Sequence, residues 1–208
     1  MGVARSIRNA AVNEQCEFYR IGLGNMKEGK APRKLKVDID ELISAMDDSS
    51  YEHNYYLDVE TGQILLVTDE IRSQLEEIYE AAPDEESGEE FDLESSLERL
   101  DLPDWQKDAL READEVEEGF GDRYISIPQV DSNEAYSDME EFNVTVTNER
   151  LQARLWQAIN GRRPFRRFKD ALEEYPTERE RWFRFEDDRT RQRVLEWLED
   201  EGIELIQE

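Results

Sequence analysis

The segment YYLDVETGQILLV, residues 55–67, contains the clearest strand pair in the sequence. Two runs rich in β-forming residues, 55–59 and 63–67, flank the short connection Glu60-Thr61-Gly62. Such runs around a short connection that contains glycine are typical of a β-hairpin, because glycine readily adopts the positive φ that tight turns require. The segment therefore predicts an antiparallel hairpin with Gly62 in its turn.

Two further segments extend the predicted sheet. Apolar and polar residues alternate near 35–39, which indicates a strand, and residues 40–46 then change to helical spacing. Residues 123–127, RYISI, form a third run of this kind, with a proline directly behind it. Together with the hairpin near 55–67, these runs predict a small antiparallel sheet.

From residue 134 to the C-terminus, apolar residues recur at helical spacing, which predicts a cluster of helices and an α+β fold. Asn148 can cap one helix, and Gly161 is expected to supply its left-handed stop. Pro164 suits the first turn of the next helix. The expected inward face of that helix consists of Phe165, Phe168 and Leu172. A capping box of Thr177 and Glu180 is expected to start a later helix. The aromatic residues expected in the core are Trp182, Phe183, Phe185 and Trp197.

The charge of the chain is large and unevenly distributed. The formal net charge is −27, from 53 acidic and 26 basic residues. Residues 1–36 nevertheless hold eight basic and three acidic residues, interrupted by glycines and a proline, which predicts a flexible basic arm over 1–34. Residues 69–118 hold 21 acidic and four basic residues. We expect an acidic helical and loop insertion there, within a single α+β domain over 35–208.

This composition bears on the environment and on the partners of the protein. Only six of the 26 basic residues are lysines, and an acidic, lysine-poor surface indicates adaptation to concentrated salt, where self-repulsion is screened. The same charge repels nucleic acid and anionic membranes at long range, so we expect no membrane partner, and nucleic acid only locally, through the arginine-rich string at 162–169. No run of about 18 apolar residues and no secretory signal are present, and a lone Cys16 fits a reducing compartment. We therefore expect a cytoplasmic protein.

The sequence contains no recognisable catalytic or cofactor-binding motif. Cys16 and His53 are the only Cys and His, too few for a zinc, iron–sulfur or haem site, and we interpret His53 as a loop residue. No nucleophile elbow and no phosphate-binding loop occur. Carboxylate pairs such as Asp47-Asp48 and Asp187-Asp188 could bind hydrated Mg²⁺ or Ca²⁺, but they lack the spacing of a calcium loop. We therefore expect no cofactor and no metal.

A basic string between residues 162 and 169 is the candidate binding site. Its cations are Arg162, Arg163, Arg166, Arg167 and Lys169. Guanidinium groups bind phosphate or carboxylate with two parallel hydrogen bonds, so the string predicts an anionic ligand or partner. The alternative is that these side chains pair with the protein's own acids nearby in the sequence, which are Glu173, Glu174, Glu178 and Glu180.

Two stretches of the sequence resemble a known family, the UPF0158 family of small bacterial proteins. They are YYLDVETG at 55–62 and GRRPFRRFKD at 161–170, and the resemblance covers about residues 35–205. The second stretch is continued by Trp182, Phe185, Trp197-Leu198 and Gly202-Ile203. The resemblance implies a shared shape, but it brings no activity and no catalytic residue.

Three hypotheses about function follow from these observations. The preferred one is a non-enzymatic binding or adaptor protein that engages an anionic partner through its Arg-rich helix. The alternatives are a metal-dependent hydrolase built on carboxylates and an acidic mimic of nucleic acid that binds a basic protein through residues 69–118. The oligomeric state stays open at this point.

Overall fold

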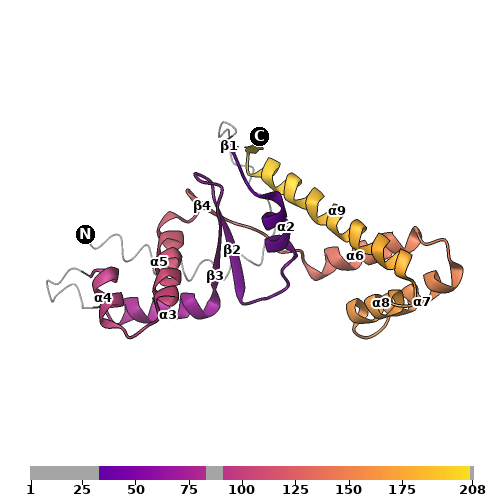
Figure 1. Cartoon of the computed structure of the whole chain (residues 1–208), viewed down its shortest axis with the longest axis horizontal. Helices are drawn as coiled ribbons and strands as arrows, with labels where there is room; N and C mark the ends of the chain where they lie inside the picture. The colour runs from indigo at the N-terminus through magenta and orange to yellow at the C-terminus, as the bar shows by residue number, and fades with distance from the viewer. Residues whose placement is uncertain (1–32, 83–90, 207–208) are drawn as a thin grey trace. The chain divides into compact units, whose positions relative to one another are not determined.

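The computed structural model describes residues 33–82 and 91–206 of the chain (Figure 1). Its central element is the predicted hairpin: β2 (His53–Asp58) pairs with β3 (Ile64–Thr68) in antiparallel register, with Tyr55 opposite Leu66. Gly62 has a φ of 81° in the turn. β4 (Tyr124–Ser126) pairs antiparallel with the other edge of β2, so the strand order is β3-β2-β4. The hairpin, the third strand and the α+β class are confirmed.

The strand predicted near 35–39 lies elsewhere. β1 (Arg33–Leu35) pairs in parallel with β5 (Ile203–Leu205) and forms a separate two-stranded sheet. The strand ends at Leu35, and α2 (Ile39–Asp47) follows after three residues, because the Asp38 side chain accepts hydrogen bonds from two backbone N–H groups and caps the helix. The alternating residues 35–39 therefore do not form one strand: Leu35 is the last residue of β1, and Ile39 is the first residue of α2.

The remaining helices flank the sheet or follow it. They are α3 (Asp69–Glu80), α4 (Leu93–Arg99), α5 (Asp104–Gly119), α6 (Ser132–Val144), α7 (Glu149–Ile159), α8 (Pro164–Leu172) and α9 (Pro176–Asp200). Asn148 caps α7 as predicted. The capping box predicted at Thr177 and Glu180 does not form, because α9 already begins at Pro176, whose fixed φ suits the first helical position.

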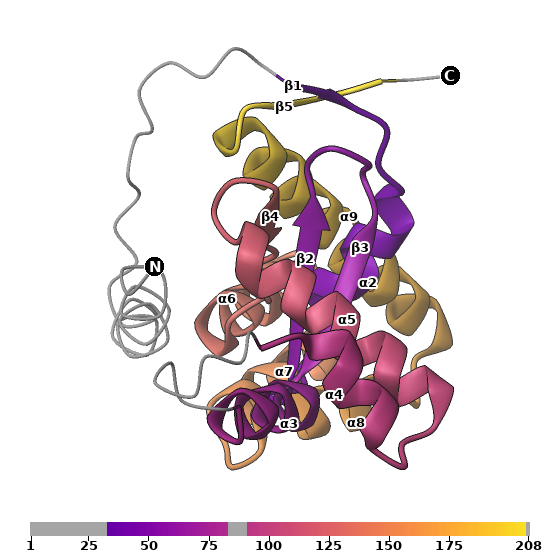
Figure 2. The same ribbon diagram turned by 90° about the vertical axis from the view of Figure 1, so that its left-hand side faces the viewer.

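Helices cover both faces of the three-stranded sheet. Tyr56 and Val67 share one hydrophobic cluster with residues of α3, α4 and α5. Leu57 and Val59 share a second cluster with residues of α2, α9 and β5. In Figure 2, α5 lies in front of the hairpin and α9 behind it. The helices of the acidic stretch 69–118 are therefore packed on the sheet by their apolar residues.

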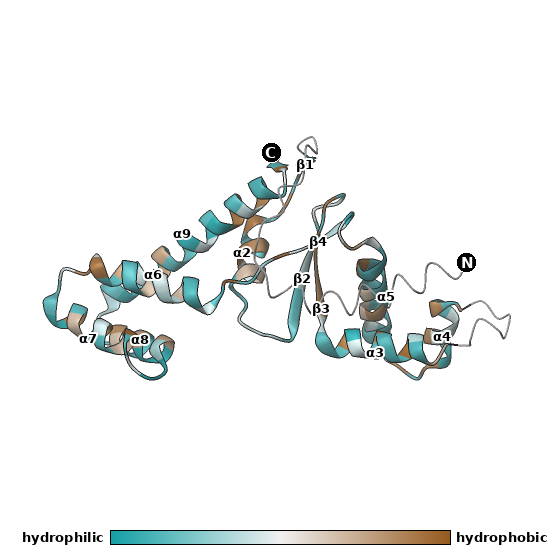
Figure 3. Ribbon diagram, turned by 180° about the vertical axis from the view of Figure 1, so that it is seen from behind, coloured by the Kyte–Doolittle hydropathy of each residue, from teal (hydrophilic) through white to brown (hydrophobic). Residues whose placement is uncertain are grey.

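A third hydrophobic cluster joins α6, α7, α8 and the first half of α9. The rings of Phe142, Phe168 and Trp182 meet edge to face, with centroids 4.8 to 6.2 Å apart, and Phe185 packs against them. Two members of the predicted aromatic cluster lie elsewhere: Phe183 is exposed, and Trp197 packs in the cluster of α2 and the sheet. The reason is that the first half of α9 packs against α6, α7 and α8, and its second half packs against α2 and the sheet. In Figure 3, α9 is mostly hydrophilic with short hydrophobic patches.

Two predictions lie at the limits of the structure. The arm expected at 1–34 falls, apart from Arg33 and Lys34, outside the described residues. The assignment of 35–208 to a single domain stays a prediction. Within 33–82 and 91–206, no helix has the length and apolar character needed to cross a bilayer.

Candidate functional site

The basic string lies on the connection between α7 and α8 and on α8 itself. Arg163 occupies the N-cap position of α8 with φ 55° and ψ 58°, and it is the one non-glycine residue with positive φ in the described ranges. Gly161, predicted as the left-handed stop of α7, has no positive φ. Glycine suits this position for another reason: an added Cβ would lie 2.7 Å from Arg167 Nη1 and 3.1 Å from the Gln157 carbonyl oxygen. The residue in the left-handed conformation is thus Arg163, two positions after Gly161, where it was expected.

α8 buries less of its predicted inward face than the sequence suggested. Phe168 and Leu172 are buried in the third hydrophobic cluster, as predicted, together with Ala171. Phe165 is 40% exposed. The helix enters the core only with its later turns, so Phe165 in the first turn stays at the surface among the arginines.

Ion pairs within the described residues leave most of the string free. Arg166 Nε lies 4.0 Å from Asp170 Oδ2, at the limit for an ion pair, and Lys169 Nζ lies 3.5 Å from Glu186 Oε1. Arg162, Arg163 and Arg167 form no ion pair with a described residue, and all five cations are exposed. Three guanidinium groups are thus available to an external anion.

The four acids considered as alternative partners point to other cations. Glu174 binds Arg154 at 2.6 Å, and this hydrogen bond lowers the pKa of the Glu174 carboxyl. Glu178 pairs with Arg181 at 2.6 Å and Glu180 with Arg184 at 3.9 Å. Glu173 forms no ion pair among the described residues. The cations of the basic string therefore form no ion pairs with these four acids.

Backbone groups add to the positive character of this surface. α8 has no side-chain cap, and its first residue, Pro164, has no N–H, so the N–H groups of Phe165 and Arg166 are left for water or a ligand. These groups and the helix dipole attract anions at a helix N-terminus. The helix pair from 149 to 172 also carries seven basic and two acidic residues within a chain of net charge −27. The surface can hold an anion through guanidinium and backbone donors together.

His53, interpreted above as a loop residue, is the first residue of β2. Its Nδ1 lies 2.6 Å from Asp48 Oδ2, which also accepts a hydrogen bond from the Tyr55 hydroxyl at 2.7 Å. The hydrogen bond with His53, together with those from the Ser50 N–H and Tyr55, lowers the pKa of Asp48 to about 2. Apart from the presence of a single histidine, nothing in the sequence indicates this contact. The contact joins the start of β2 to the end of α2.

The carboxylate pairs named above do not assemble into a metal site. In residues 33–82 and 91–206, no three side chains of Asp, Glu, His or Cys converge so that they could hold a metal ion. Burial raises the pKa of Asp47, and likewise that of Glu186 beside Lys169. These acids belong to the contact between the end of α2, α8 and α9.

Two buried carboxylates, Asp58 and Asp138, are not predicted from the sequence. Asp58 lies under Arg123, and Asp138 lies between Arg189 and Arg193. With 53 acidic residues in the chain, no spacing in the sequence distinguishes these two from the exposed majority.

The fold and this site define an acidic α+β protein with a cationic surface on a short helix pair. The uncharacterised protein family UPF0158 matches residues 93–208. A UPF0158 protein of Pseudomonas aeruginosa is 30% identical over 172 residues, which cover 83% of this chain and 87% of that protein. The chain belongs to the UPF0158 family, and the resemblance seen in the sequence is confirmed.

More distant relatives are also found. UPF0158 proteins of Chlamydia muridarum and Chlamydia trachomatis are each 28% identical over 108 residues, which cover 51% of this chain and 32% of theirs. The chain thus spans about a third of the length of these chlamydial relatives. No solved structure matches the chain.

Proposed function

We propose that this protein is a non-enzymatic binding protein that engages an anionic partner through the basic string of α8. One observation carries the proposal: Arg162, Arg163 and Arg167 are exposed without an ion pair among the described residues, while nearby acids pair with other arginines. Free guanidinium groups next to unused backbone donors are typical of phosphate and carboxylate recognition.

The charge of the rest of the molecule limits the kind of contact. A long polyanion lying along the surface would meet a chain of net charge −27, which repels it. The proposed partner therefore offers a compact anionic group, or an anionic segment short enough to touch the helix pair alone. In concentrated salt such a contact depends on direct hydrogen bonds, because the Debye length falls to about 3 Å at 1 M.

The backbone of Arg163 gives additional support. A non-glycine residue in the left-handed region costs roughly 1–2 kcal/mol, and such conformations concentrate at ligand-binding sites. Here the conformation places two adjacent arginines on the connection that leads into the first turn of α8.

The test measures binding of two short labelled probes, a triglutamate peptide and inorganic triphosphate, to the full chain by fluorescence anisotropy. We expect binding to at least one probe. The double variant Arg162→Ala/Arg163→Ala should bind about tenfold more weakly, because each charge-assisted hydrogen bond contributes about 1.5–3 kcal/mol and exposure reduces that value.

The matched control removes the same charge elsewhere. Arg99→Ala/Arg184→Ala deletes two exposed arginines of α4 and α9, outside the string. This variant should bind within about twofold of the wild type, because only general attraction is lost. The proposal is wrong if both double variants lose affinity equally, or if the wild type binds neither probe.

A further inference from the structure

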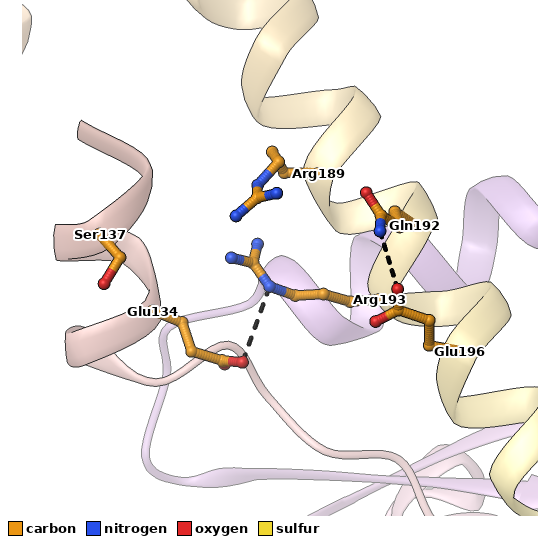
Figure 4. A pocket seen from close by; sticks show the side chains of 6 residues that line it. All are labelled: Glu134, Ser137, Arg189, Gln192, Arg193 and Glu196. Atoms are coloured by element: carbon orange, nitrogen blue, oxygen red, sulfur yellow. Dashed lines mark hydrogen bonds and ion pairs between the residues drawn. The ribbon is translucent and has the colours of Figure 1, made fainter. Parts of the chain in front are cut away.

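A polar pocket lies between α6 and α9, apart from the basic string. Its lining residues are Glu134, Ser137, Arg189, Gln192, Arg193 and Glu196. Figure 4 shows the guanidinium groups of Arg189 and Arg193 next to each other on the α9 side, with Ser137 and Glu134 on the α6 side. The pocket therefore brings two like charges together at its centre.

A buried carboxylate holds these two arginines in place. Asp138, only 4% exposed, accepts a hydrogen bond from Arg189 Nε at 2.9 Å. Its two oxygens also accept hydrogen bonds from Arg193 Nη2 at 2.9 and 2.7 Å. A buried charge is stable only with such partners, so the positions of both guanidinium groups are fixed by the fold.

Donor capacity is left over after this pairing. Arg189 uses Nη2 for Glu141 in addition to its bond with Asp138. The Nη1 groups of Arg189 and Arg193 have no hydrogen-bond acceptor among the described residues. A planar guanidinium carries five N–H donors and is suited to binding a carboxylate with two parallel bonds. The pair is thus preorganised for one oxyanion.

The rim of the pocket carries the opposite charge. Glu134 Oε1 lies 3.7 Å from Arg193 Nε, and Glu196 accepts a hydrogen bond from the Gln192 side chain at 2.8 Å. The charged lining residues are therefore two arginines and two glutamates. A simple anion would be repelled by the rim, and a simple cation would be repelled by the guanidinium groups.

We infer that this pocket binds a small zwitterion of the α-amino acid class. Its carboxylate accepts from the free Nη1 groups of Arg189 and Arg193, and its ammonium group is held by the carboxylates of Glu134 and Glu196. Such a ligand presents a negative group to the guanidinium donors and a positive group to the glutamates, whereas phosphate, with two negative charges, would be repelled by both glutamates.

The test is an NMR titration of the full chain with three probes at matched concentration: L-alanine, acetate and ethylammonium. The readouts are the Gln192 side-chain amide and the Nε–H signals of the two arginines. L-alanine should give saturable shifts and bind at least about fivefold more tightly than either single-charge probe, because it gains both sets of ion pairs.

A variant pair tests the location without disturbing the buried network. Ser137 is exposed on α6, and its hydroxyl donates only to the Asn133 carbonyl one turn earlier, so Ser137→Tyr fills the pocket and leaves Asp138 paired. Ser132→Tyr places the same side chain on the exposed first turn of α6, outside the pocket. L-alanine binding should disappear in Ser137→Tyr and persist in Ser132→Tyr.

Three results would overturn the inference. The first is the absence of a saturable shift with L-alanine in the wild type. The second is acetate or ethylammonium binding as tightly as L-alanine, which would make the pocket a site for a single charge. The third is undiminished L-alanine binding in Ser137→Tyr, which would place the ligand elsewhere on the protein.

Discussion

Arg123, immediately before β4, holds the buried carboxylate of Asp58 at the end of β2. Its Nη2 and Nε donate to Asp58 Oδ2 at 2.7 and 3.0 Å. The other oxygen, Oδ1, accepts hydrogen bonds from the backbone N–H groups of Glu60 at 2.8 Å and Thr61 at 3.2 Å. Burial pushes the pKa of Asp58 upward, but these hydrogen bonds outweigh it and lower that pKa. One carboxylate therefore shapes the hairpin turn and ties the third strand to it.

Replacing Arg123 should destabilise the protein strongly. Arg123→Ala leaves the Asp58 carboxylate buried with only two backbone donors, and removing one partner of a buried pair costs about 3–5 kcal/mol. The two remaining hydrogen bonds and the partial exposure of Arg123 reduce the expected loss to about 2–3 kcal/mol. The measurement is the urea midpoint of unfolding at neutral pH. Glu60→Gln, a change at an exposed acid 3.7 Å from the same guanidinium, should alter stability by less than about 0.5 kcal/mol. Equal effects in the two variants would contradict this account.

Two glycines with the same φ separate backbone strain from steric contact. Gly62 and Gly121 both have φ of 81°. An added Cβ at Gly62 would lie 2.0 Å from the Lys36 carbonyl oxygen, whereas nothing lies within 4 Å of one at Gly121. Gly121→Ala should therefore cost only the left-handed penalty of about 1–2 kcal/mol. Gly62→Ala should cost about 1–3 kcal/mol more, because the backbone must move to relieve the clash. Thermal unfolding of both variants checks the order, and a Gly121→Ala loss as large as that of Gly62→Ala would show that the contact with Lys36 is not significant.

The sequence predicts those parts of the fold that are determined by residues adjacent in the chain. The hairpin follows from two β-forming runs and Gly62, and the start of α8 follows from Pro164. β1 was assigned to the wrong sheet because its partner β5 lies at the opposite end of the chain, and three alternating residues do not specify a partner.

At the candidate sites, only contacts between residues close in the sequence could be predicted. The five cations of the basic string could be read from the sequence, since they are adjacent in it. The arginines over Asp138 come from a different helix, and the chain has many acids and arginines that could pair by chance. Phe165 was predicted inward because its spacing to Phe168 fits a helical face, but spacing alone does not show where a helix leaves the core.

Acid unfolding should depend on the contact between His53 and Asp48. The pKa of Asp48 is lowered from 3.8 to about 2 in the folded state, with the His53 hydrogen bond as the main cause. A lowered folded-state pKa gives stability that is present above about pH 4 and is lost as the pH falls toward 2. His53→Ala should raise the Asp48 pKa and flatten the pH dependence of stability in that window. NMR titration of the carboxyl carbon measures the pKa directly. Tyr55→Phe, which removes a weaker contributor, should shift it less, and an unchanged pKa in His53→Ala would refute this role of the contact.

The two phenylalanines of α8 should differ sharply when truncated. Phe168→Ala removes a fully buried ring between Phe142 and Trp182, and such changes cost about 3–5 kcal/mol. Phe165→Ala shortens a side chain that is 40% exposed, so it should cost about 1 kcal/mol or less. Urea unfolding of the two variants provides the comparison. Similar losses would mean that the first turn of α8 is packed more tightly than the structure shows.

Concentrated salt should stabilise the protein, because its net charge of −27 opposes a compact state. Raising KCl from about 0.1 M to about 1 M shortens the Debye length from about 10 to about 3 Å and screens that repulsion. The unfolding temperature should therefore rise with KCl. A matched variant carries Glu77→Lys, Glu98→Lys and Glu112→Lys, at three exposed acids of α3, α4 and α5 that form no ion pair with a described residue. Each change removes a negative charge and adds a positive one, so the variant should be more stable at low salt and gain less from KCl. If the two proteins gain equally, salt acts through apolar burial or ion binding, and the acidic surface is not what makes the protein depend on it.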